Sequence, residues 1–329
     1  MRMHRTLALG AAMLSSLLLA VACNNDNGSP GGGGTTPATT TAATPSPSAA
    51  PSPAAACSGP VTVGVSGDFA ESQIMAELYG QVLENAGCSV SYQLHLGSRE
   101  ISDKALQTGD IDIKPEYLAY ELPALDPKAD TSGTPDEVAA RLAPLLESKD
   151  LALLDFTPAN DTNAFVVTQE TAQKLTVASL SDLASVAGQL TLGGPPECPR
   201  RPFCIPGLKK VYGIEFDKFQ PIGACDTNTA NALINGAVDV ALLCSTQSII
   251  AKANLVALQD DKNLQAAGNI APIVRKDVLT DQMTALLNAV SATIDDATIT
   301  QLNEQVEIEH QDAADVAKSF LEDQGLVSS

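Results

Sequence analysis

Short apolar runs alternate with longer stretches of helical spacing along most of the chain. In the segment 68–86, apolar side chains recur at Ile74, Leu78 and Val82, which is the spacing of one helix face, and Gly87 ends the pattern. The segment before residue 114 predicts strands at 60–65, 89–96 and 111–113 and helices at 68–86 and 101–107. This alternation indicates an α/β fold with a mostly parallel sheet that is covered by helices.

A second unit of the same plan begins at Asn163, after a predicted helix at 136–148 and a predicted strand at 151–155. Its predicted elements are strands at 163–168, 190–194 and 238–243 and helices from 181, at 207–212 and at 229–235. We therefore expect two lobes with a cleft between them, at the carboxyl ends of the strands. Predicted helices at 280–294, 299–306 and 312–323 are expected to return to the first lobe. Lobe 1 would then take residues 57–163 and 270–329, and lobe 2 would take residues 164–269.

Residues 1–22 have the layout of a secretory signal. Arg2 and Arg5 precede the apolar run 7–19, and three small residues then precede Cys23. The apolar run is too short for a stable transmembrane span. A cysteine in this position is typical of a bacterial lipobox, in which Cys23 becomes the lipidated first residue. An ordinary secretory signal with an incidental cysteine is the alternative.

The segment 23–56 predicts a flexible linker. Residues 28–56 are all glycine, serine, threonine, proline or alanine, a composition that cannot bury a core. A lipid, a flexible spacer and a folded domain together describe an exported protein that is held at the outer face of the cell membrane. Firm attachment needs more than one acyl chain, which a lipidated Cys23 would supply.

The chain is strongly acidic. It has 39 Asp and Glu against 19 Lys and Arg, a net charge of −20. Two of the basic residues belong to the predicted signal, so the mature chain is more acidic still. This charge argues against nucleic acid as a partner and is explained by solubility outside the cell.

The seven cysteines become six once Cys23 is set aside, and an even number in an exported chain predicts disulfides. We expect the pairs Cys57–Cys88, Cys198–Cys204 and Cys225–Cys244, because each pair joins neighbouring elements of one lobe. A zinc site is the alternative, but no C-x-x-C pair is present and neither His95 nor His310 is near a cysteine in the sequence. No metal and no other cofactor is expected.

The segment 109–117, Gly-Asp-Ile-Asp-Ile-Lys-Pro-Glu-Tyr, carries a resemblance to a known family together with other landmarks in the same order and spacing. These landmarks are Gly67 to Glu71, Leu96 to Ser98, Lys104 to Leu106, Pro158 to Ala164, Asn231 to Leu233, Val238 to Val240, Asp260 to Lys262 and Ala271 to Arg275. Over residues 60–326 the chain resembles the osmoprotectant-binding proteins of ABC importers, which hold quaternary-ammonium solutes such as glycine betaine and choline. The resemblance implies a two-lobe periplasmic-binding-protein (type II) fold and a monomeric receptor that works with a permease and an ATPase.

The family holds its ligand in a cage of aromatic rings, and this chain departs from that pattern. Lys114 stands where the family has one aromatic wall, and Cys244 and Gly268 align with two others. Gly67 aligns with a lysine that helps to hold the betaine carboxylate. Each aromatic face contributes about 0.5–2 kcal/mol, so the loss of three would weaken betaine binding by roughly 1.5–6 kcal/mol. We therefore expect a remodelled pocket that prefers a ligand other than betaine or choline.

Two interpretations of the basic residues stay open. In one, a polar, anionic or flat ligand contacts Ser98, Arg99, Lys114 and Asn160. In the other, Arg99 is a solvated surface residue and Lys114 pairs with Glu116 or Asp112. Tyr117 and Tyr120 either restore part of the aromatic surface or pack in the core. The candidate ligand-binding residues are Asp68, Ser98, Arg99, Lys114, Tyr117, Asn160, Cys244 and Gly268.

The loop 195–206 contains five prolines, a basic pair and Phe203. It either edges the cleft, faces the transporter or has a structural role alone.

Two other classes of function compete with the receptor. An exported enzyme would need a nucleophile with a base, a carboxylate pair or a metal. The segment Gly64-Val65-Ser66-Gly67 is not a nucleophile elbow, because Gly67 follows the serine directly. We therefore do not expect an enzyme. A sensor or scaffold domain on the same fold is the remaining alternative.

Overall fold

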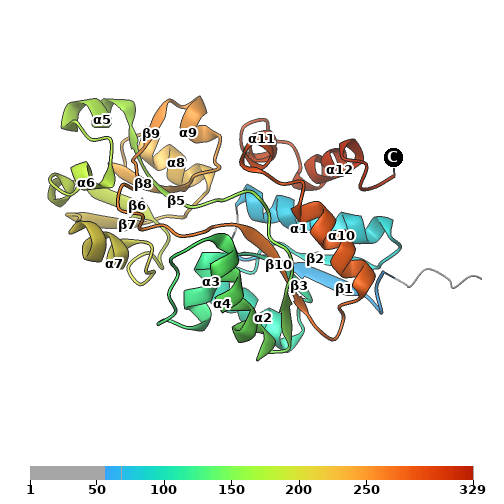
Figure 1. Cartoon of the computed structure of the whole chain (residues 1–329). Helices are drawn as coiled ribbons and strands as arrows, with labels where there is room; N and C mark the ends of the chain where they lie inside the picture. Colours follow the sequence, from blue (N-terminus) through green and yellow to red (C-terminus); the bar gives the residue numbers. More distant parts are fainter. Residues whose placement is uncertain (1–55, 68, 329) are drawn as a thin grey trace, which may run out of the picture. The chain divides into compact units, whose positions relative to one another are not determined.

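The computed structural model describes residues 56–67 and 69–328, so Cys23, the linker before residue 56 and Asp68 lie outside the described residues. It contains two five-stranded sheets, each flanked by helices (Figure 1). We call the body built on each sheet a lobe. The predicted α/β class with two lobes is confirmed.

The sheet of the first lobe has the strand order β2-β1-β3-β10-β4. The strands are β1 (Val61–Gly64), β2 (Val90–Gln93), β3 (Ile113–Tyr117), β4 (Leu151–Leu153) and β10 (Ile270–Arg275). Strand β1 runs parallel to β2 and β3, whereas β10 runs antiparallel to both β3 and β4. Four strands therefore share one direction, as expected for a mostly parallel sheet, and only the strand that returns from the second lobe is reversed.

The sheet of the second lobe repeats this plan in the order β7-β6-β8-β5-β9. The strands are β5 (Asn163–Thr168), β6 (Thr191–Gly194), β7 (Lys218–Pro221), β8 (Val240–Cys244) and β9 (Leu255–Ala257). Strand β6 pairs in parallel with β7 and β8, and β5 is antiparallel to β8 and β9. The chain crosses between the sheets twice, from β4 to β5 and from β9 to β10. We call these stretches the crossing segments.

Helices cover both sheets. The helices of the first lobe are α1 (Ala70–Asn85), α2 (Arg99–Thr108), α3 (Leu118–Leu125), α4 (Pro135–Glu147), α10 (Asp281–Ser291), α11 (Asp296–Glu307) and α12 (Ala313–Asp323). Those of the second lobe are α5 (Gln169–Leu175), α6 (Leu180–Leu183), α7 (Ile205–Gly207), α8 (Thr227–Ile234) and α9 (Ile249–Lys252), with a 3-10 turn at Ala187–Gln189 and a π-helical turn at Leu208–Tyr212. Among the described residues, no helix has the length and apolar character needed to span a membrane.

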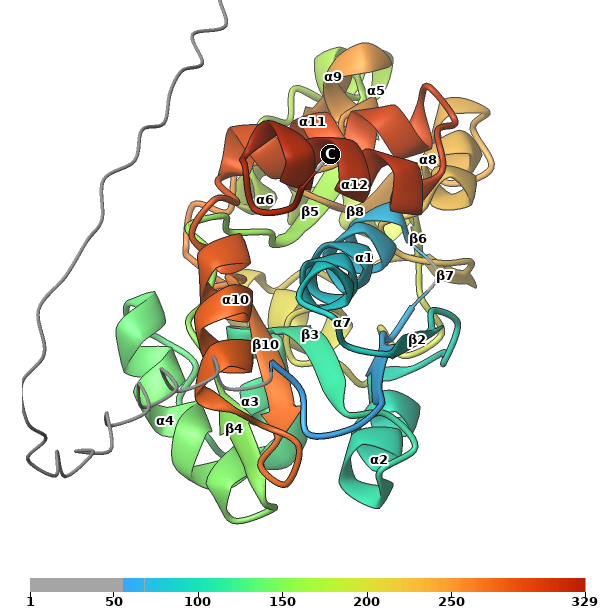
Figure 2. The same ribbon diagram turned by 90° about the vertical axis from the view of Figure 1, so that its right-hand side faces the viewer.

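Strand β10 shows why the first lobe has two cores. Because successive side chains of a strand point to opposite faces, Ile270 and Val274 join one apolar cluster while Ala271 and Ile273 join another. The first cluster includes buried side chains of α1 and of the three C-terminal helices α10, α11 and α12. The second is built from α2, α3 and α4. Figure 2 shows α1 and α10 on the same side of this sheet.

Three disulfides join Cys57 to Cys88, Cys198 to Cys204 and Cys225 to Cys244, which is the pairing expected from the sequence. The first ties the segment before β1 to the segment before β2. The second closes a loop after β6. The third ties the segment before α8 to the end of β8, so it holds two neighbouring elements of the second lobe together.

The C-terminal helices are expected to contribute to the stability of the first lobe, because their side chains pack in its core. Leu287 of α10 is fully buried in the first cluster, whereas the adjacent Leu286 is only partly buried. Leu287→Ala should therefore lower the free energy of unfolding by about 2–5 kcal/mol, because it leaves a cavity in the core. Urea denaturation followed by circular dichroism measures this change. Leu286→Ala is the matched control and should cost clearly less; equal losses would contradict the packing described here.

Candidate functional site

Four aromatic rings form a row at the carboxyl end of β3. Phe69 precedes α1, Tyr117 ends β3, Tyr120 lies in the first turn of α3, and Phe203 comes from the loop between the second pair of cysteines in the second lobe. The ring centroids are 6.4 Å apart for Phe69 and Tyr117, 6.1 Å for Tyr117 and Tyr120, and 5.1 Å for Tyr120 and Phe203. We call these four residues the aromatic row. It runs from one lobe to the other.

Hydrogen bonds hold the aromatic row to the crossing segments. The hydroxyl of Tyr120 accepts a hydrogen bond from the backbone N–H of Asn163 at 3.0 Å and donates one to Oε1 of Gln265 at 3.2 Å. Nε2 of Gln265 in turn donates to the carbonyl of Phe203 at 3.0 Å. The position of the row therefore depends on how the two lobes meet.

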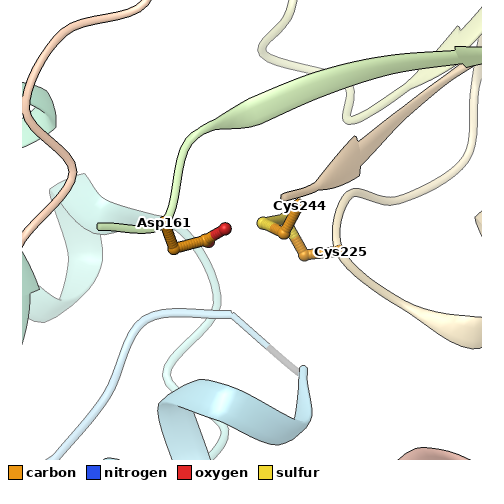
Figure 3. A group of neighbouring side chains, drawn as sticks. All are labelled: Asp161, Cys225 and Cys244. Atoms are coloured by element: carbon orange, nitrogen blue, oxygen red, sulfur yellow. A yellow bond between two sulfur atoms is a disulfide. The ribbon is translucent and has the colours of Figure 1, made fainter. Parts of the chain in front are cut away.

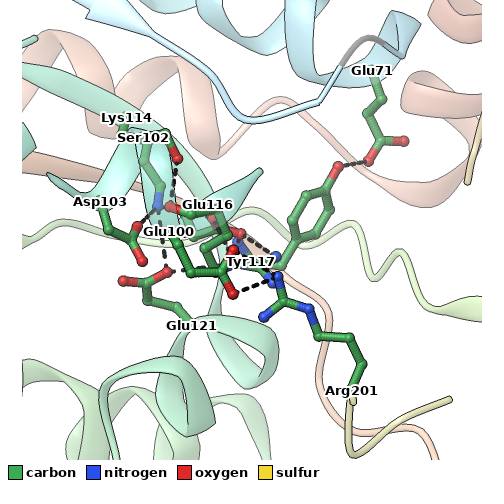
Figure 4. Close-up of polar contacts among 10 residues, drawn as sticks. Glu71, Glu100, Ser102, Asp103, Lys114, Glu116, Tyr117, Glu121 and Arg201 are labelled. Carbon is green, nitrogen blue, oxygen red and sulfur yellow. Dashed lines mark hydrogen bonds and ion pairs between the residues drawn. The ribbon is translucent and has the colours of Figure 1, made fainter. Parts of the chain in front are cut away.

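Glu71 of α1 connects the aromatic row to the second lobe. Its side chain is 2% exposed, and it accepts a hydrogen bond from the hydroxyl of Tyr117 at 2.7 Å (Figure 4). Its other carboxylate oxygen accepts from Oγ1 of Thr246 at 2.6 Å and from Nδ2 of Asn303 at 2.9 Å. Burial raises the pKa of Glu71 because these neutral donors only partly replace the lost water.

Asp161, in the first crossing segment, is a second buried carboxylate. Its Oδ1 accepts hydrogen bonds from Oγ of Ser245 at 3.0 Å and from the backbone N–H of Thr246 at 3.2 Å. Burial, and then the negative charge of Glu71, raise the pKa of Asp161 well above its ordinary value. Among the described residues, no lysine or arginine forms an ion pair with Glu71 or Asp161.

The sulfurs of Cys225 and Cys244 lie beside Asp161 (Figure 3). Three such groups within 4.8 Å of one another have the spacing of a metal site. Both sulfurs, however, belong to one disulfide and offer no thiolate, which is the form of cysteine that binds metals. This group therefore does not have the chemistry of a metal centre.

A cavity of about 320 Å³ lies beside Phe69. It is bordered by the start of α1, the start of α8 and the end of α11, so both lobes contribute to its walls. The lining residues are Phe69, Ala70, Gln73, Cys225, Asp226, Thr227, Val306, Glu307 and His310.

Lys114 lies in a buried ion cluster with Asp103, Glu116 and Glu121 (Figure 4). Arg99 belongs to the same ion cluster through its pair with Glu116. The side chain of Lys114 is 0% exposed, and its Nζ lies 3.0 Å from Glu116 and 3.4 Å from Glu121, in addition to a contact with Asp103. The interpretation in which Lys114 pairs with Glu116 is confirmed. Asp112, the other expected partner, instead accepts a hydrogen bond from the backbone N–H of Thr62.

Arg99 completes this ion cluster. Nε and Nη2 of Arg99 donate to the two oxygens of Glu116 at 3.0 and 2.9 Å, and the side chain is 16% exposed. The interpretation of Arg99 as a solvated surface residue is therefore wrong. A bidentate pair of this kind is the strongest geometry that an arginine and a carboxylate adopt.

The carboxylates of the ion cluster differ in their protonation. Burial alone would raise the pKa of Glu116, but Arg99 and Lys114 outweigh it and lower the pKa to about 2. Burial dominates at Glu121, where the pKa rises to about 7 despite the nearby Lys114. Because three carboxylates surround two cations, the positive charges of Arg99 and Lys114 are already compensated within the cluster and would not attract an anionic ligand.

The structure brings three other predicted residues to the junction between the lobes. Cys244 is buried in its disulfide beside Asp161. Oδ1 of Asn160 accepts a hydrogen bond from the backbone N–H of Gly268 at 2.6 Å. Ser98 lies at the start of α2, where its carbonyl accepts hydrogen bonds from the backbone of the first helical turn.

Sequence reasoning missed several residues of this junction as candidates. They are Phe69, Glu71, Asp161, Phe203, Thr246 and Asn303. Glu71 did carry a signal, because it precedes Ile74 by three residues and Leu78 by seven, so it lies on the apolar face of its helix. A carboxylate on that face must be buried and needs partners.

The sequence and the fold match a known family. A family model for the substrate binding domain of the ABC-type glycine betaine transport system matches residues 59–323, and the chain therefore belongs to this family. The family is one of transport proteins that bind solutes rather than of enzymes.

Relatives and solved structures agree with the family. The chain is 29% identical over 278 residues to the glycine betaine-binding protein YehZ of Escherichia coli, covering 81% of this chain and 91% of that protein. It is 30% identical over 274 residues to a glycine-betaine-binding protein of Pseudomonas aeruginosa, covering 79% and 86%. A crystal structure of a glycine betaine/carnitine/choline ABC transporter superposes with a TM-score of 0.64 at 26% identity, covering 81% of this chain and 99% of that one. These matches confirm the predicted type II periplasmic-binding-protein fold.

The ion cluster is expected to depend on Lys114. Lys114→Met removes one of two cations from among two buried carboxylates and a partly buried third, and breaking a buried ion pair in this way costs about 3–5 kcal/mol. Urea denaturation at neutral pH measures the loss. Lys128→Met, at an exposed position, is the control and should change stability by no more than about 0.5 kcal/mol. Similar small effects of both substitutions would show that the cluster does not stabilise the fold.

Proposed function

We propose that this chain captures a small quaternary-ammonium solute between its two lobes and delivers it to the permease of an ABC importer. The observation that carries the proposal is the aromatic row at the junction of the lobes, next to two buried carboxylates without basic partners. Aromatic faces attract cations through their quadrupole, and the attraction grows when water is excluded. Membership of the family supports the transport role.

The charge at the junction favours a cation over an anion. Glu71 and Asp161 bring carboxyl groups beside the rings, and a bound cation would favour their ionised forms over the protonated forms that burial favours. Lys114 and Arg99, by contrast, are neutralised inside the ion cluster. We therefore favour a cationic solute over the polar or anionic ligand that one interpretation of the sequence allowed. Tyr117 remains a proposed ligand contact, and Asp68 and Ser98 stay predictions.

Binding is proposed to close the lobes by a hinge motion at the crossing segments, as in other two-lobe receptors. Contacts across the junction support this motion. Thr246 reaches Glu71, Arg201 pairs with Glu100 at 2.9 Å, and Lys252 pairs with Glu304 at 2.6 Å. These bonds join two loops and helix α9 of the second lobe to helices of the first, so opening the lobes would break all three together.

The proposal also includes the partner proteins of this chain and its attachment to the membrane. Several relatives are named as binding proteins for glycine betaine or carnitine, and one for ergothioneine; such proteins work with a permease and an ATPase. We propose that this chain does the same, as an exported monomer that is not an enzyme. It would be anchored to the outer face of the membrane through the lipidated Cys23.

Titration of the purified protein with glycine betaine, choline and carnitine tests the solute class by isothermal calorimetry. Phe203→Leu should weaken the affinity by about 2- to 30-fold, because one aromatic face contributes about 0.5–2 kcal/mol. Phe219→Leu is the matched control, since Phe219 packs in the second lobe's core on β7. The absence of any heat with all three solutes would contradict the proposed function.

Membrane attachment has its own test. Cys23→Ser should move the protein from the membrane fraction to the soluble exported fraction, because the acyl chains that anchor it can no longer be attached. Immunoblots of fractionated cells report the distribution, and Asn24→Ser should leave the protein in the membrane fraction. A Cys23→Ser protein that stays with the membrane would rule out this anchor.

A further inference from the structure

The side chain of Gln265 joins three separate parts of the chain. Its Oε1 accepts a hydrogen bond from the hydroxyl of Tyr120 in α3 at 3.2 Å and another from Nδ2 of Asn163 at the start of β5, also at 3.2 Å. Its Nε2 donates to the carbonyl of Phe203, in the disulfide-closed loop of the second lobe, at 3.0 Å. One amide group therefore ties together Tyr120 and Phe203, whose rings meet across the two lobes.

Gln265 also lies where the second crossing segment passes from one lobe to the other. Leu264 packs against the apolar core of the second lobe, whereas Ala266 and Ala267 pack against the first lobe's cluster of α2, α3 and α4. Neighbouring residues thus belong to different cores, and Gln265 stands between them. A change in the angle between the lobes has to be taken up by backbone torsions at or near such a residue.

Hydrogen bonds anchor the segment on both sides of this point. Before it, the carboxylate of Asp260 accepts from the backbone N–H of Gln265 at 2.7 Å and from the hydroxyl of Tyr212, which lies in the second lobe's core. After it, the carbonyl of Ala267 accepts from the backbone N–H of Ala119 in α3 at 3.0 Å. A hinge that keeps both anchors intact is therefore confined to the stretch from Gln265 to Ala267.

We infer that Gln265 is a positioning residue that completes the aromatic row when the lobes close on a solute. The inference rests on the proposed function and adds to it the step that couples closure to the binding surface. Because the hinge itself carries the amide group, rotation there moves this group relative to Tyr120, and Phe203 moves with the second lobe. The bonds to both residues form together only in the arrangement described here, in which the two rings are 5.1 Å apart, edge to face.

Replacement of Gln265 by leucine tests this role through the rates of binding. Among glycine betaine, choline and carnitine, the solute that the unaltered protein binds most tightly serves as the probe. Gln265→Leu should weaken its affinity by about 5- to 50-fold, because hydrogen bonds of ordinary strength to Tyr120 and Phe203 are lost. The loss should appear as faster dissociation, with the association rate changed by less than about threefold, because the bonds form after the solute has entered.

Surface plasmon resonance measures both rates. Gln259→Leu replaces an exposed glutamine of the same crossing segment, so it is the matched control and should leave both rates unchanged. Gln265→Met, a second apolar replacement with an unbranched side chain, should behave like Gln265→Leu. Urea denaturation verifies that the variants compared are folded.

A double substitution distinguishes positioning from a purely structural effect. Phe203→Leu keeps the backbone carbonyl that Gln265 contacts and removes only the ring. If Gln265 places that ring, Phe203→Leu should lower the affinity clearly less in the Gln265→Leu protein than in the unaltered protein. Its effect in the Gln259→Leu protein should be undiminished.

Amide hydrogen exchange gives a readout that needs no solute. The backbone N–H of Asn163 donates to the hydroxyl of Tyr120, and Gln265 accepts from that same hydroxyl. Peptides that contain Asn163 should therefore exchange faster in Gln265→Leu than in the unaltered protein, because the hydroxyl is no longer held in place. Exchange of the same peptides in Gln259→Leu should match that of the unaltered protein.

The outcomes separate this inference from the proposed function. Unchanged dissociation rates in both Gln265 variants would overturn the positioning role. So would additive losses in the double substitution, or unchanged exchange at Asn163. In each of these cases a bound solute still supports the proposed function. Failure of all three solutes to bind the unaltered protein would overturn both.

Discussion

The two crossing segments approach each other so closely that the junction between the lobes depends on their contact. A Cβ on Gly268 would lie 1.6 Å from the carbonyl oxygen of Asp161, a distance that no side chain tolerates. The backbone N–H of Asp161 donates to the carbonyl of Gly268 at 3.1 Å, which fixes the pair. With its backbone held in this way, Asp161 reaches Ser245 and Thr246 at the end of β8. The carboxyl ends of both sheets therefore meet at one point, where α/β proteins bind their ligands.

Buried charged side chains have different kinds of partners in the ion cluster and at the junction between the lobes. In the ion cluster, Lys114 and Arg99 are matched by carboxylates, so the charges cancel within the first lobe. At the junction, Glu71 and Asp161 have only neutral donors, and burial raises the pKa of both carboxyl groups. Lys114, which the resemblance places at the position of an aromatic wall, therefore does not bring a free positive charge to the junction. It moves that charge into the interior, and Phe69, Tyr117, Tyr120 and Phe203 supply aromatic surface from other positions.

The sequence predicts well those helices and strands whose apolar pattern lies within one short segment of the chain. The spacing of Ile74, Leu78 and Val82 predicts α1, and the apolar runs predict most strands of both sheets. The direction of β10 carries no such signal, because alternating side chains look the same in either direction. Helix α3 was not predicted, since Pro123 interrupts its pattern.

The site was predictable only in part, because its contacts join distant parts of the chain. The pairing of Lys114 with Glu116 needs only two residues of one strand, and sequence reasoning included it. The bond from Asn303 to Glu71 spans 232 residues, and nothing near Asn303 in the sequence indicates it. Phe203 was noted in its proline-rich loop, but its contact with Tyr120 depends on how the second lobe meets the first.

The Cys225–Cys244 disulfide forms only in an oxidising compartment, so the geometry of the junction depends on where the protein folds. Cys244 directly precedes Ser245 and Thr246, which contact the two junction carboxylates, and Cys225 directly precedes the cap of α8. In a reducing cytoplasm these segments would be joined by noncovalent contacts alone. Recombinant material from that compartment would lack the crosslink between the segment before α8 and the end of β8. Heterologous production therefore has to pass through an oxidising environment before affinities are compared.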